Sequence, residues 1–491
     1  MKTLLAIDQS TSATKAILFD EQGAVLARAS REHRQIYPQP GWVEHDAEEI
    51  WRNVLETVRE FANTYQSSFA SLACLSLTNQ RETIVVFDRA TGRPLHPAIV
   101  WQCRRGEPGC KAIREAGCED MVRRKTGLML DTYFSGSKLK WLVDNVPGLG
   151  EKLRRGEALV GTIETYLIYR LTAGAVFATE QTNASRTILF DIERMRWDEE
   201  LCGLFGVPLQ ALAEVRESST QFGKTDIEGL LSHAVPICGV MGDSQAALFA
   251  QRCFSPGMGK ATFGTGTSVL LNIGLRHAQP APGVVLALAW VIHGQPTYAL
   301  EGVINCSAAT ITWLKDQMNL IRSSGETEGL VRSVPDNGGV YFVPAFAGLG
   351  APHWAPEARG AIVGLTAFTR REHIVRAAEE AIAYQIHDVL ELMRGSASLP
   401  ITTLRADGGP TRDSFLMQFT ADITGLPLEV SETPEASAWG ATMMGLLGLG
   451  LRSVEDLQAM PRQSRTYTPA MERAKVTALQ QEWRTAVKRV L

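Results

Sequence analysis

Several features that mark other classes of protein are missing from this 491-residue sequence. It has no block of Lys or Arg, and its 49 basic and 53 acidic residues leave a net charge of −4. A surface for nucleic acid or for an acidic membrane is therefore not expected. The longest apolar run, from Val284 to Ile292, is less than half of the roughly 20 residues that a membrane-spanning helix needs. We expect neither nucleic-acid nor membrane partners.

Paired cysteines and a leader are also missing. The eight cysteines are scattered and form no CxxC pair, so neither a disulfide nor a zinc framework is expected. The opening MKTLLAIDQS passes from one Lys to an Asp within eight residues, unlike a signal peptide. Apolar residues make up 45% and charged residues 21% of the chain, as in ordinary globular proteins. The sequence predicts a cytoplasmic α/β protein with reduced, mostly buried thiols.

The common nucleotide-binding motifs are absent as well. There is no GxxxxGK[ST], and the nearest segment, Gly257 to Lys260, lacks the upstream glycine. No GxGxxG follows an expected strand, and neither HExxH nor an HRD and DFG pair occurs. A nucleotide site in this chain must therefore use a different device.

The order of expected elements is similar in the two halves of the chain. The first half opens with strands at 3–7, 15–19 and 24–29, a helix that Asp46 caps, and strands at 73–77 and 83–87. The second half has two strands within Gly259 to Gly274, a third at 284–292, and a helix from Ser307 to Leu320. This pattern predicts two related α/β domains with a boundary near 245–255. Ligands commonly bind in a cleft between such domains.

Three polar turns are candidates for binding phosphate. In the segment Asp8 to Lys15, a carboxylate that could hold magnesium is followed by several hydroxyls. Gly264 to Thr267 and the pair Gly408 and Gly409 each follow an expected strand, and glycine lets backbone approach a phosphate closely. Each turn alone could equally be an ordinary hairpin or loop. Together, on two similar domains, they indicate a nucleotide site.

Further polar side chains sit at the ends of expected strands. Arg81 with Glu82 could grip vicinal hydroxyls, and Trp101 could wall the carbon side of a polyol. The alternatives are a plain salt bridge and a core tryptophan. Asp243 follows the expected strand Val235 to Val240 and opens a helix. It could be the helix N-cap, the base that accepts a hydroxyl proton, or both.

Longer motifs resemble those of the FGGY carbohydrate kinases, and among them the glycerol kinases. The resemblance covers roughly residues 3 to 460, and the segments that carry it are IYPQPGWVEH, NQRET, IVWQCRR, YFSGSKLKWLVDN, TNASRT, VPAFAGLGAP and DGG. It implies an α/β fold of two ribonuclease-H-like (actin-like ATPase) domains with an interdomain active-site cleft. The N-terminal domain would span 1–248 and the C-terminal domain 249–491.

The resemblance also implies a site. Asp243 would be the general base and Asp8 the residue that holds Mg²⁺, the two catalytic residues. The polyol would contact Arg81, Glu82, Trp101, Tyr133, Asp243, Ser244 and Ser268. ATP would contact Ser10, Thr11, Ser12, Lys15, Gly264, Thr265, Gly266, Ala308, Thr312, Gly408, Gly409 and Asp413. Catalysis would consist mainly of positioning and charge neutralisation.

This chain departs from the glycerol kinase pattern on both the polyol and the nucleotide side. Ser244 replaces Gln and Ser268 replaces Phe in the polyol pocket, which predicts a wider and wetter site. Ser10 and Lys15 replace Gly and Arg in the first turn. Near the adenosine, Asp413 stands for Asn, Ala308 for Gly and Thr312 for Gln. Glu379 stands where an apolar residue is usual in the second family signature.

Three functions follow from these residues. The first is an ATP-dependent kinase of glycerol or a closely related small polyol. The second is a kinase of a larger tetritol, pentitol or ketopentose. The third is a non-catalytic nucleotide-binding regulator, which the retained Asp243, Arg81 and Glu82 disfavour. A homodimer or homotetramer is expected from the resemblance alone.

Overall fold

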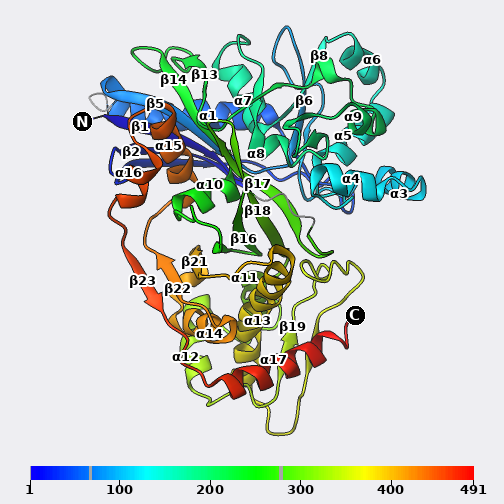
Figure 1. The fold of residues 1–491 in the computed structure, drawn as a ribbon, viewed down its shortest axis with the longest axis vertical. Helices are drawn as coiled ribbons and strands as arrows, with labels where there is room; N and C mark the ends of the chain where they lie inside the picture. Colours follow the sequence, from blue (N-terminus) through cyan, green and yellow to red (C-terminus); the bar gives the residue numbers. More distant parts are fainter. Residues whose placement is uncertain (1, 66–68, 276–279) are drawn as a thin grey trace. The chain divides into compact units, whose positions relative to one another are not determined.

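The computed structural model describes residues 2–65, 69–275 and 280–491 (Figure 1). The chain divides into two compact units. Unit 1 comprises Met1–Arg252, Ala287–Tyr298 and Pro434–Met460, and unit 2 comprises Cys253–Leu286, Ala299–Thr433 and Pro461–Leu491. Each unit is therefore built from segments that are far apart in the sequence.

Unit 1 is organised around a six-stranded sheet with the order β13-β14-β5-β1-β2-β3. Its strands are β1 (Thr3–Gln9), β2 (Ala13–Asp20), β3 (Val25–Glu32), β5 (Leu72–Asn79), β13 (Gln221–Thr225) and β14 (Val235–Gly242). β1 pairs antiparallel with β2 and parallel with β5, and β14 extends the parallel part. Every residue of β1 is buried, as its near-continuous apolar run requires. The expected opening meander and the expected strand 73–77 are confirmed.

Helices cover this sheet. α1 (Ala47–Thr64) begins after Asp46, whose side chain accepts a hydrogen bond from the backbone N–H of Glu48, so the expected N-cap is confirmed. α10 (Asp243–Ala250) and α15 (Ala436–Gly448) contact each other, and α15 also contacts β14, β5 and β1. The two helices meet at Gly440, where a Cβ would stand 1.8 Å from the carbonyl oxygen of Ala246. Only glycine permits so close an approach.

The rest of unit 1 is an α/β layer beside the main sheet. Its four-stranded sheet has the order β4-β7-β6-β8, with β4 (Glu44–His45), β6 (Ile84–Asp88), β7 (Ala98–Ile99) and β8 (Ala158–Thr162). The short strands are β9 (Ala178–Glu180), β10 (Phe190–Asp191), β11 (Arg196–Trp197) and β12 (Glu214–Arg216). The helices are α3 (Glu107–Glu115), α4 (Glu119–Thr126), α5 (Ser135–Asn145), α6 (Leu149–Arg154), α7 (Ile163–Leu171), α8 (Gln181–Ala184), α9 (Glu199–Phe205) and η1 (Leu209–Ala211). A further helix of this unit, α16 (Val454–Ala459), lies apart from this layer, near α15 and β2 (Figure 1).

The other large sheet has the order β17-β18-β16-β15-β21-β22-β23. Its strands are β15 (Met258–Phe263), β16 (Thr267–Gly274), β17 (Val285–Ile292), β18 (Gln295–Ile304), β21 (Thr403–Asp407), β22 (Leu428–Ser431) and β23 (Ser464–Tyr467). β15 pairs antiparallel with β16 and parallel with β21. β19 (Tyr341–Val343) and β20 (Ala361–Val363) form a separate pair in unit 2. The strands expected within 259–274 and at 284–292 are confirmed.

The helices of unit 2 surround α13 (Arg371–Ala397), which contacts α11 (Ala308–Asp316), α12 (Thr327–Arg332) and α14 (Ser414–Thr424). The remaining helical segments are η2 (Ser324–Glu326), η3 (Gly409–Arg412) and α17 (Arg473–Val487). α11 ends at Asp316, four residues before the expected end at Leu320, because the backbone N–H of Leu320 folds back onto the carbonyl of Leu314.

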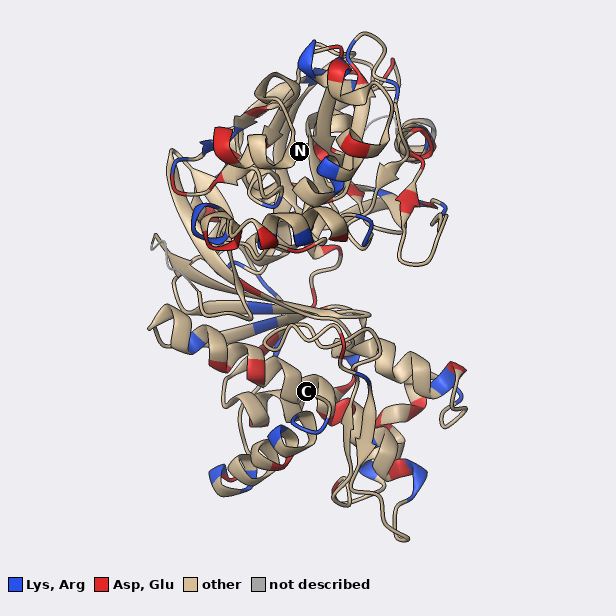
Figure 2. Cartoon of the chain, turned by 90° about the vertical axis from the view of Figure 1, so that its right-hand side faces the viewer, with Lys and Arg blue, Asp and Glu red and all other residues tan. Residues whose placement is uncertain are grey.

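Three global expectations can be compared with this structure. Of the eight cysteines, Cys118 is half-buried and the other seven are buried, as expected for most of them. Within the three described ranges, we find no helix with the length and apolar content needed to cross a membrane. In the view of Figure 2, basic and acidic residues are interspersed along both units, in line with the small net charge.

Candidate active site

Asp8 lies near the end of β1, at the centre of the main sheet of unit 1. Its carboxylate is 3.6 Å from Lys15 Nζ on β2, and Lys15 in turn donates a 2.9 Å hydrogen bond to Glu435. Burial raises the pKa of Asp8 to about 6; Lys15 opposes this shift, and the carboxylates of Asp243 and Glu435 add to it. Arg28 and Arg81 pair with Glu435 and Asp243, so Asp8 is a buried carboxylate within a network of opposite charges.

The turn after β1 is held in shape by its own hydroxyls and by distant side chains. The backbone N–H and the hydroxyl of Ser10 both donate to the carbonyl of Ala13, at 2.9 and 3.0 Å. The hydroxyl of Thr11 accepts a 3.0 Å hydrogen bond from Trp101 Nε1. Ser12 is exposed at the tip. Thr11 thus links the predicted phosphate turn to the tryptophan predicted to wall the polyol.

A buried ion cluster includes the predicted pair Arg81 and Glu82. Arg81 Nε is 3.3 Å from Asp243 Oδ1 and 3.9 Å from Glu82 Oε1, and Arg81 Nη1 donates to Gln245 Oε1 at 3.1 Å. Glu82 Oε1 also accepts a 2.6 Å hydrogen bond from Arg186 Nε. The plain salt-bridge interpretation is too simple, because Arg81 holds two carboxylates and an amide together.

The backbone of Glu82 is also unusual. Its φ of +62° places a non-glycine residue in the left-handed region, a conformation that costs about 1–3 kcal/mol and is concentrated at functional sites. The backbone carbonyl of Glu82 accepts a 2.9 Å hydrogen bond from the hydroxyl of Ser135, at the start of α5. The strained turn is thus held from a second element.

Trp101 and Tyr133 form an aromatic wall, with ring centroids 5.3 Å apart. Tyr133 precedes α5, and Lys138 fixes this turn because its Nζ donates to the carbonyls of Thr132, Tyr133 and Phe134 at 2.5, 2.7 and 3.2 Å. Burial lowers the pKa of Lys138 to about 8. The side chain of Trp101 is only half-buried, so its interpretation as a core tryptophan is wrong.

Asp243 is the first residue of α10, and Gly242 occupies the N-cap position without a side-chain cap. The interpretation of Asp243 as the helix N-cap is therefore wrong. Its side chain is 39% exposed, unlike the buried Arg81 that holds it, and its Oδ1 accepts a 2.6 Å hydrogen bond from the backbone N–H of Ser244. A positioned carboxylate that remains accessible can accept a proton from a bound hydroxyl.

In unit 2, the turn Gly264 to Thr267 is held by the start of α11. The backbone N–H groups of Ser307 and Ala309 donate to the carbonyl of Thr265 at 2.8 and 3.1 Å. At Gly266, a Cβ would stand 2.4 Å from the carbonyl oxygen of Ile304, so only glycine fits. Ser268 follows on β16, and its hydroxyl donates to Glu301 Oε1 at 3.5 Å.

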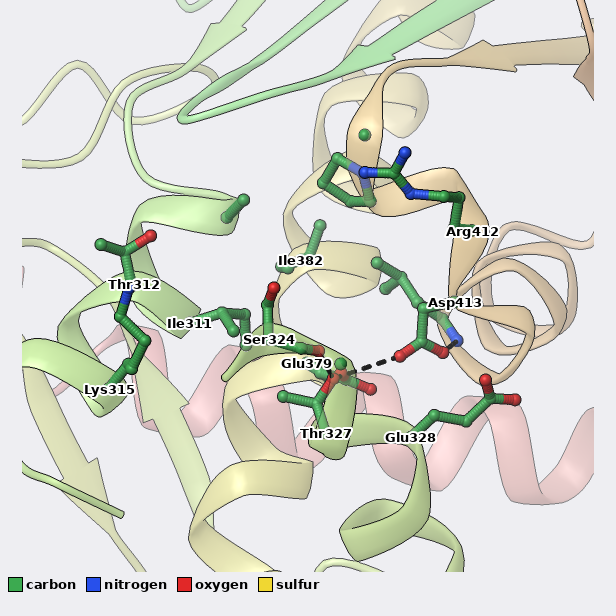
Figure 3. Close-up of a pocket in the computed structure, with 15 residues that line it drawn as sticks. Ile311, Thr312, Lys315, Ser324, Thr327, Glu328, Glu379, Ile382, Arg412 and Asp413 are labelled. Atoms are coloured by element: carbon green, nitrogen blue, oxygen red, sulfur yellow. Dashed lines mark hydrogen bonds between the residues drawn. The ribbon is translucent and has the colours of Figure 1, made fainter. Parts of the chain in front are cut away.

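A cavity of about 410 Å³ opens in unit 2 (Figure 3). Gly408 precedes it with φ +103°, and a Cβ there would stand 1.9 Å from the carbonyl oxygen of Phe263. The Asp413 side chain caps α14 by accepting from the N–H groups of Phe415 and Leu416. The cavity is lined by Ala308, Ile311, Thr312, Lys315, Ser324, Gly325, Thr327, Glu328, Glu379, Ile382, Gly409, Pro410, Arg412, Asp413 and Leu416.

The predicted residues therefore fall into two groups. Unit 1 contains those predicted for the base, for the first phosphate turn and for most of the polyol site, while unit 2 contains Ser268, the second phosphate turn and the adenosine residues. Of the adenosine residues, Ala308, Thr312, Gly409 and Asp413 line one cavity.

Sequence reasoning assigned no site role to five residues that the structure links to these groups: Lys138, Arg186, Gln245, Glu379 and Glu435. Three of them had a signal in the sequence. Arg186 belongs to the TNASRT segment, and Glu379 breaks an otherwise apolar signature. Lys138 likewise belongs to the YFSGSKLKWLVDN segment, and its bonds go to residues four to six positions before it. The links made by Gln245 and Glu435 depend on the fold and leave no comparable local pattern.

This geometry is accompanied by a clear family relationship. Residues 3–250 match the N-terminal domain, and residues 259–449 the C-terminal domain, of the FGGY family of carbohydrate kinases. The chain belongs to this family. The predicted family and the predicted α/β fold of two actin-like ATPase domains are confirmed, and so is the class of activity, an ATP-dependent phosphotransferase.

Individual relatives narrow the family further. The chain is 45% identical over 491 residues to the glycerol kinase of Desulfitobacterium hafniense, covering 100% of this chain and 99% of the relative. It is 45% identical over 494 residues to glycerol kinase 2 of Thermotoga maritima, covering 100% and 99%. The crystal structure of Plasmodium falciparum glycerol kinase with ADP aligns with a TM-score of 0.94 at 34% identity, covering 100% of this chain and 98% of that one.

Proposed function

We propose that this protein transfers the γ-phosphoryl group of ATP to a hydroxyl of glycerol. The observation that carries the proposal is the cluster in which Arg81 holds an accessible Asp243 beside the buried Glu82. The full-length relatives named glycerol kinase, and the glycerol kinase solved with ADP, support it.

In this proposal, unit 1 binds and activates the polyol. Arg81 donates to one hydroxyl while Glu82 accepts from its neighbour, and Trp101 with Tyr133 covers the carbon side. Asp243 accepts the proton of the attacking hydroxyl as the phosphoryl group arrives. Because Arg81 and the N–H of Ser244 hold the carboxylate from two directions, little reorganisation is needed in the reaction.

The proposed nucleotide groups lie in both units. The cavity beside Gly409 has the lining to enclose a base and ribose. The N–H groups and hydroxyls of the turns at Ser10–Ser12 and Gly264–Thr267 would bind phosphate oxygens, and Lys15 would contribute positive charge.

Magnesium fits this proposal as a companion of the nucleotide. Among the described residues, no group of three or more His, Cys, Asp or Glu could form a protein cage for a metal ion. Mg²⁺ is commonly held by one or two carboxylates together with substrate phosphates. Asp8 suits that role because its carboxylate is buried at the end of β1, where a bound cation would offset the cost of burying its charge. When bound, the ion would neutralise charge on the transferring phosphoryl group.

A second candidate substrate is a larger polyol or ketose. It rests on Ser244 and Ser268, small hydroxyl residues where the glycerol kinase pattern has Gln and Phe. Both are half-buried, so both remain available to a ligand. The wider pocket they predict would accept a four- or five-carbon chain.

The experiment that tests both candidates is coupled ADP release with Mg-ATP across a panel. The panel contains glycerol, dihydroxyacetone, erythritol, threitol, xylitol, ribitol and the pentuloses. We expect the highest kcat/KM for glycerol. A longer compound that exceeds glycerol by about tenfold, about 1.4 kcal/mol of transition-state binding, would establish the second candidate. Silence across the panel would refute both and favour a regulatory role.

A further inference from the structure

The cavity in unit 2 contains a buried carboxyl group that the proposed function does not use. Glu379 lies on α13 and lines the cavity, although its side chain is only 2% exposed. Its Oε2 is buried without a hydrogen-bond partner in the described part of the chain. Figure 3 shows Glu379 close to Thr327 and facing the side of the cavity that Asp413 occupies.

The polar neighbours of Glu379 already have other partners. Asp413 Oδ1 accepts the capping hydrogen bonds of α14 at 2.9 and 3.0 Å. Asp413 Oδ2 accepts from the hydroxyl of Thr327 at 3.4 Å, and this hydroxyl also lies 2.8 Å from the carbonyl of Ser324. Both neighbours also interact with the carboxyl group of Glu379. Its Oε2 nevertheless has no hydrogen-bond partner among the described residues, so a ligand in the cavity would supply one.

The charges around Glu379 are mostly negative. Asp413 at the start of α14 and Glu328 on α12 face it, and burial followed by the Asp413 carboxylate raises the pKa of Glu379 well above its ordinary range. On its own helix, Arg376 pairs with Glu380. Lys315 on α11 and Arg412 on η3 line the same cavity, and neither forms a salt bridge with Glu379 in the described structure.

A protonated carboxyl group offers one donor and one acceptor side by side. Adenine presents the complementary pair, an N6–H donor next to the N1 acceptor. Guanine instead presents two adjacent donors, N1–H and N2–H, which an ionised carboxylate would match. The protonation state of Glu379 therefore changes which base it pairs with.

We propose that Glu379 is a specificity-determining residue of the nucleotide site, whose carboxyl group pairs with the polar edge of adenine. The proposal rests on the proposed function, because it requires the cavity to receive the base of the nucleotide. It assigns to Glu379 a preference for adenine over guanine that weakens as the group ionises.

The test is calorimetric binding of ADP and GDP to the full chain at about pH 6 and about pH 9, because burial raises the pKa of Glu379 well above its ordinary range. The wild type should prefer ADP, by about tenfold at the lower pH, the scale of one bidentate base contact. The preference should shrink at the higher pH. Glu379→Gln keeps one donor and one acceptor at every pH, so its preference should persist unchanged. Glu379→Leu should lose the preference at both.

Glu391→Gln is the matched control, since Glu391 lies on the same helix but is paired with Arg394 at the surface. It should behave as the wild type. If Glu379→Leu fails to fold, the loss of pH dependence in Glu379→Gln still decides the matter. A wild type without ADP preference, or with a preference that neither variant changes, would overturn the inference. A wild type that shows the pattern but phosphorylates nothing in the panel would refute only the proposed function.

Discussion

Glu82 in unit 1 and Glu379 in unit 2 are both almost fully buried, but their surroundings differ. Glu82 accepts a 2.6 Å hydrogen bond from Arg186 and lies 3.9 Å from Arg81. Glu379 faces the Asp413 carboxylate, and one of its oxygens has no partner in the described structure. The first carboxylate is compensated by two guanidinium groups, whereas the second faces another acid.

This difference separates two uses of a buried acid. A compensated carboxylate keeps a fixed acceptor for substrate hydroxyls, but removing one of its partners leaves an uncompensated charge. An uncompensated acid avoids that cost by holding its proton, and it then offers a donor as well as an acceptor. Unit 1 is thus arranged around permanent charge, and the cavity of unit 2 around a group that can change its charge.

The largest expected effect comes from Asp243, the accessible member of the compensated cluster. Asp243→Asn removes the proposed base but preserves the shape of the side chain beside Arg81. We expect kcat to fall by about 10²- to 10⁴-fold, with little change in the midpoint of thermal unfolding. Coupled ADP release measures the rate, and Asp120→Asn, at an exposed carboxylate of α4, is the control. A loss below about tenfold would exclude Asp243 as the base.

The second prediction tests whether Arg186 compensates the buried charge of Glu82. Arg186→Met should lower the free energy of unfolding by about 3–5 kcal/mol, because it removes the guanidinium group 2.6 Å from the buried carboxylate of Glu82. Urea unfolding measures this loss. Arg194→Met, at an exposed arginine 3.8 Å from Asp191, should cost at most about 1 kcal/mol. If the two variants lower the free energy of unfolding equally, Arg186 does not stabilise the buried carboxylate of Glu82.

Local signals predicted much of the fold and part of this comparison. The cap at Asp46, the strand ends that carry Asp8 and Arg81, and the glycine turns all depend on neighbours within a few residues. The pairing of Glu82 with Arg186 spans 104 residues, and that of Lys15 with Glu435 spans 420. No local pattern encodes these contacts.

Long-range contact also explains why the organisation into units differs from a single cut in the chain. Residues 287–298 and 434–460 belong to the same unit as the first 252 residues. α15 is placed there because its small residues pack closely against α10 and the main sheet, a preference that its apolar composition does not reveal. Similarly, Glu379 is conspicuous in the sequence as a departure, but only the fold shows that it lines a cavity.

The third effect concerns specificity on the polyol side. The double variant Ser244→Gln and Ser268→Phe should favour glycerol over four- and five-carbon substrates. We expect the ratio of their kcat/KM values to rise by a factor equivalent to about 1–3 kcal/mol, as when a pocket gains one apolar contact. The panel assay measures this ratio, and Ser232→Gln at an exposed serine is the control. An unchanged ratio would mean that the two serines do not shape the pocket.

The smallest expected effect is a change in the free energy of unfolding that should have opposite signs at Glu379 and Glu82. Because the pKa of Glu379 is raised in the folded protein, the native state keeps a proton that the unfolded chain loses above about pH 4.3. The free energy of unfolding therefore falls as pH rises toward the raised pKa. Glu379→Gln removes this penalty and should gain about 1 kcal/mol relative to wild type, more at about pH 9 than at about pH 6. Glu82→Gln should instead destabilise at both, since it leaves Arg186 without its carboxylate. Urea unfolding of both variants, with Glu391→Gln as the surface control, measures the two signs. If both variants changed stability in the same direction, the two buried acids would not differ in how their charge is compensated.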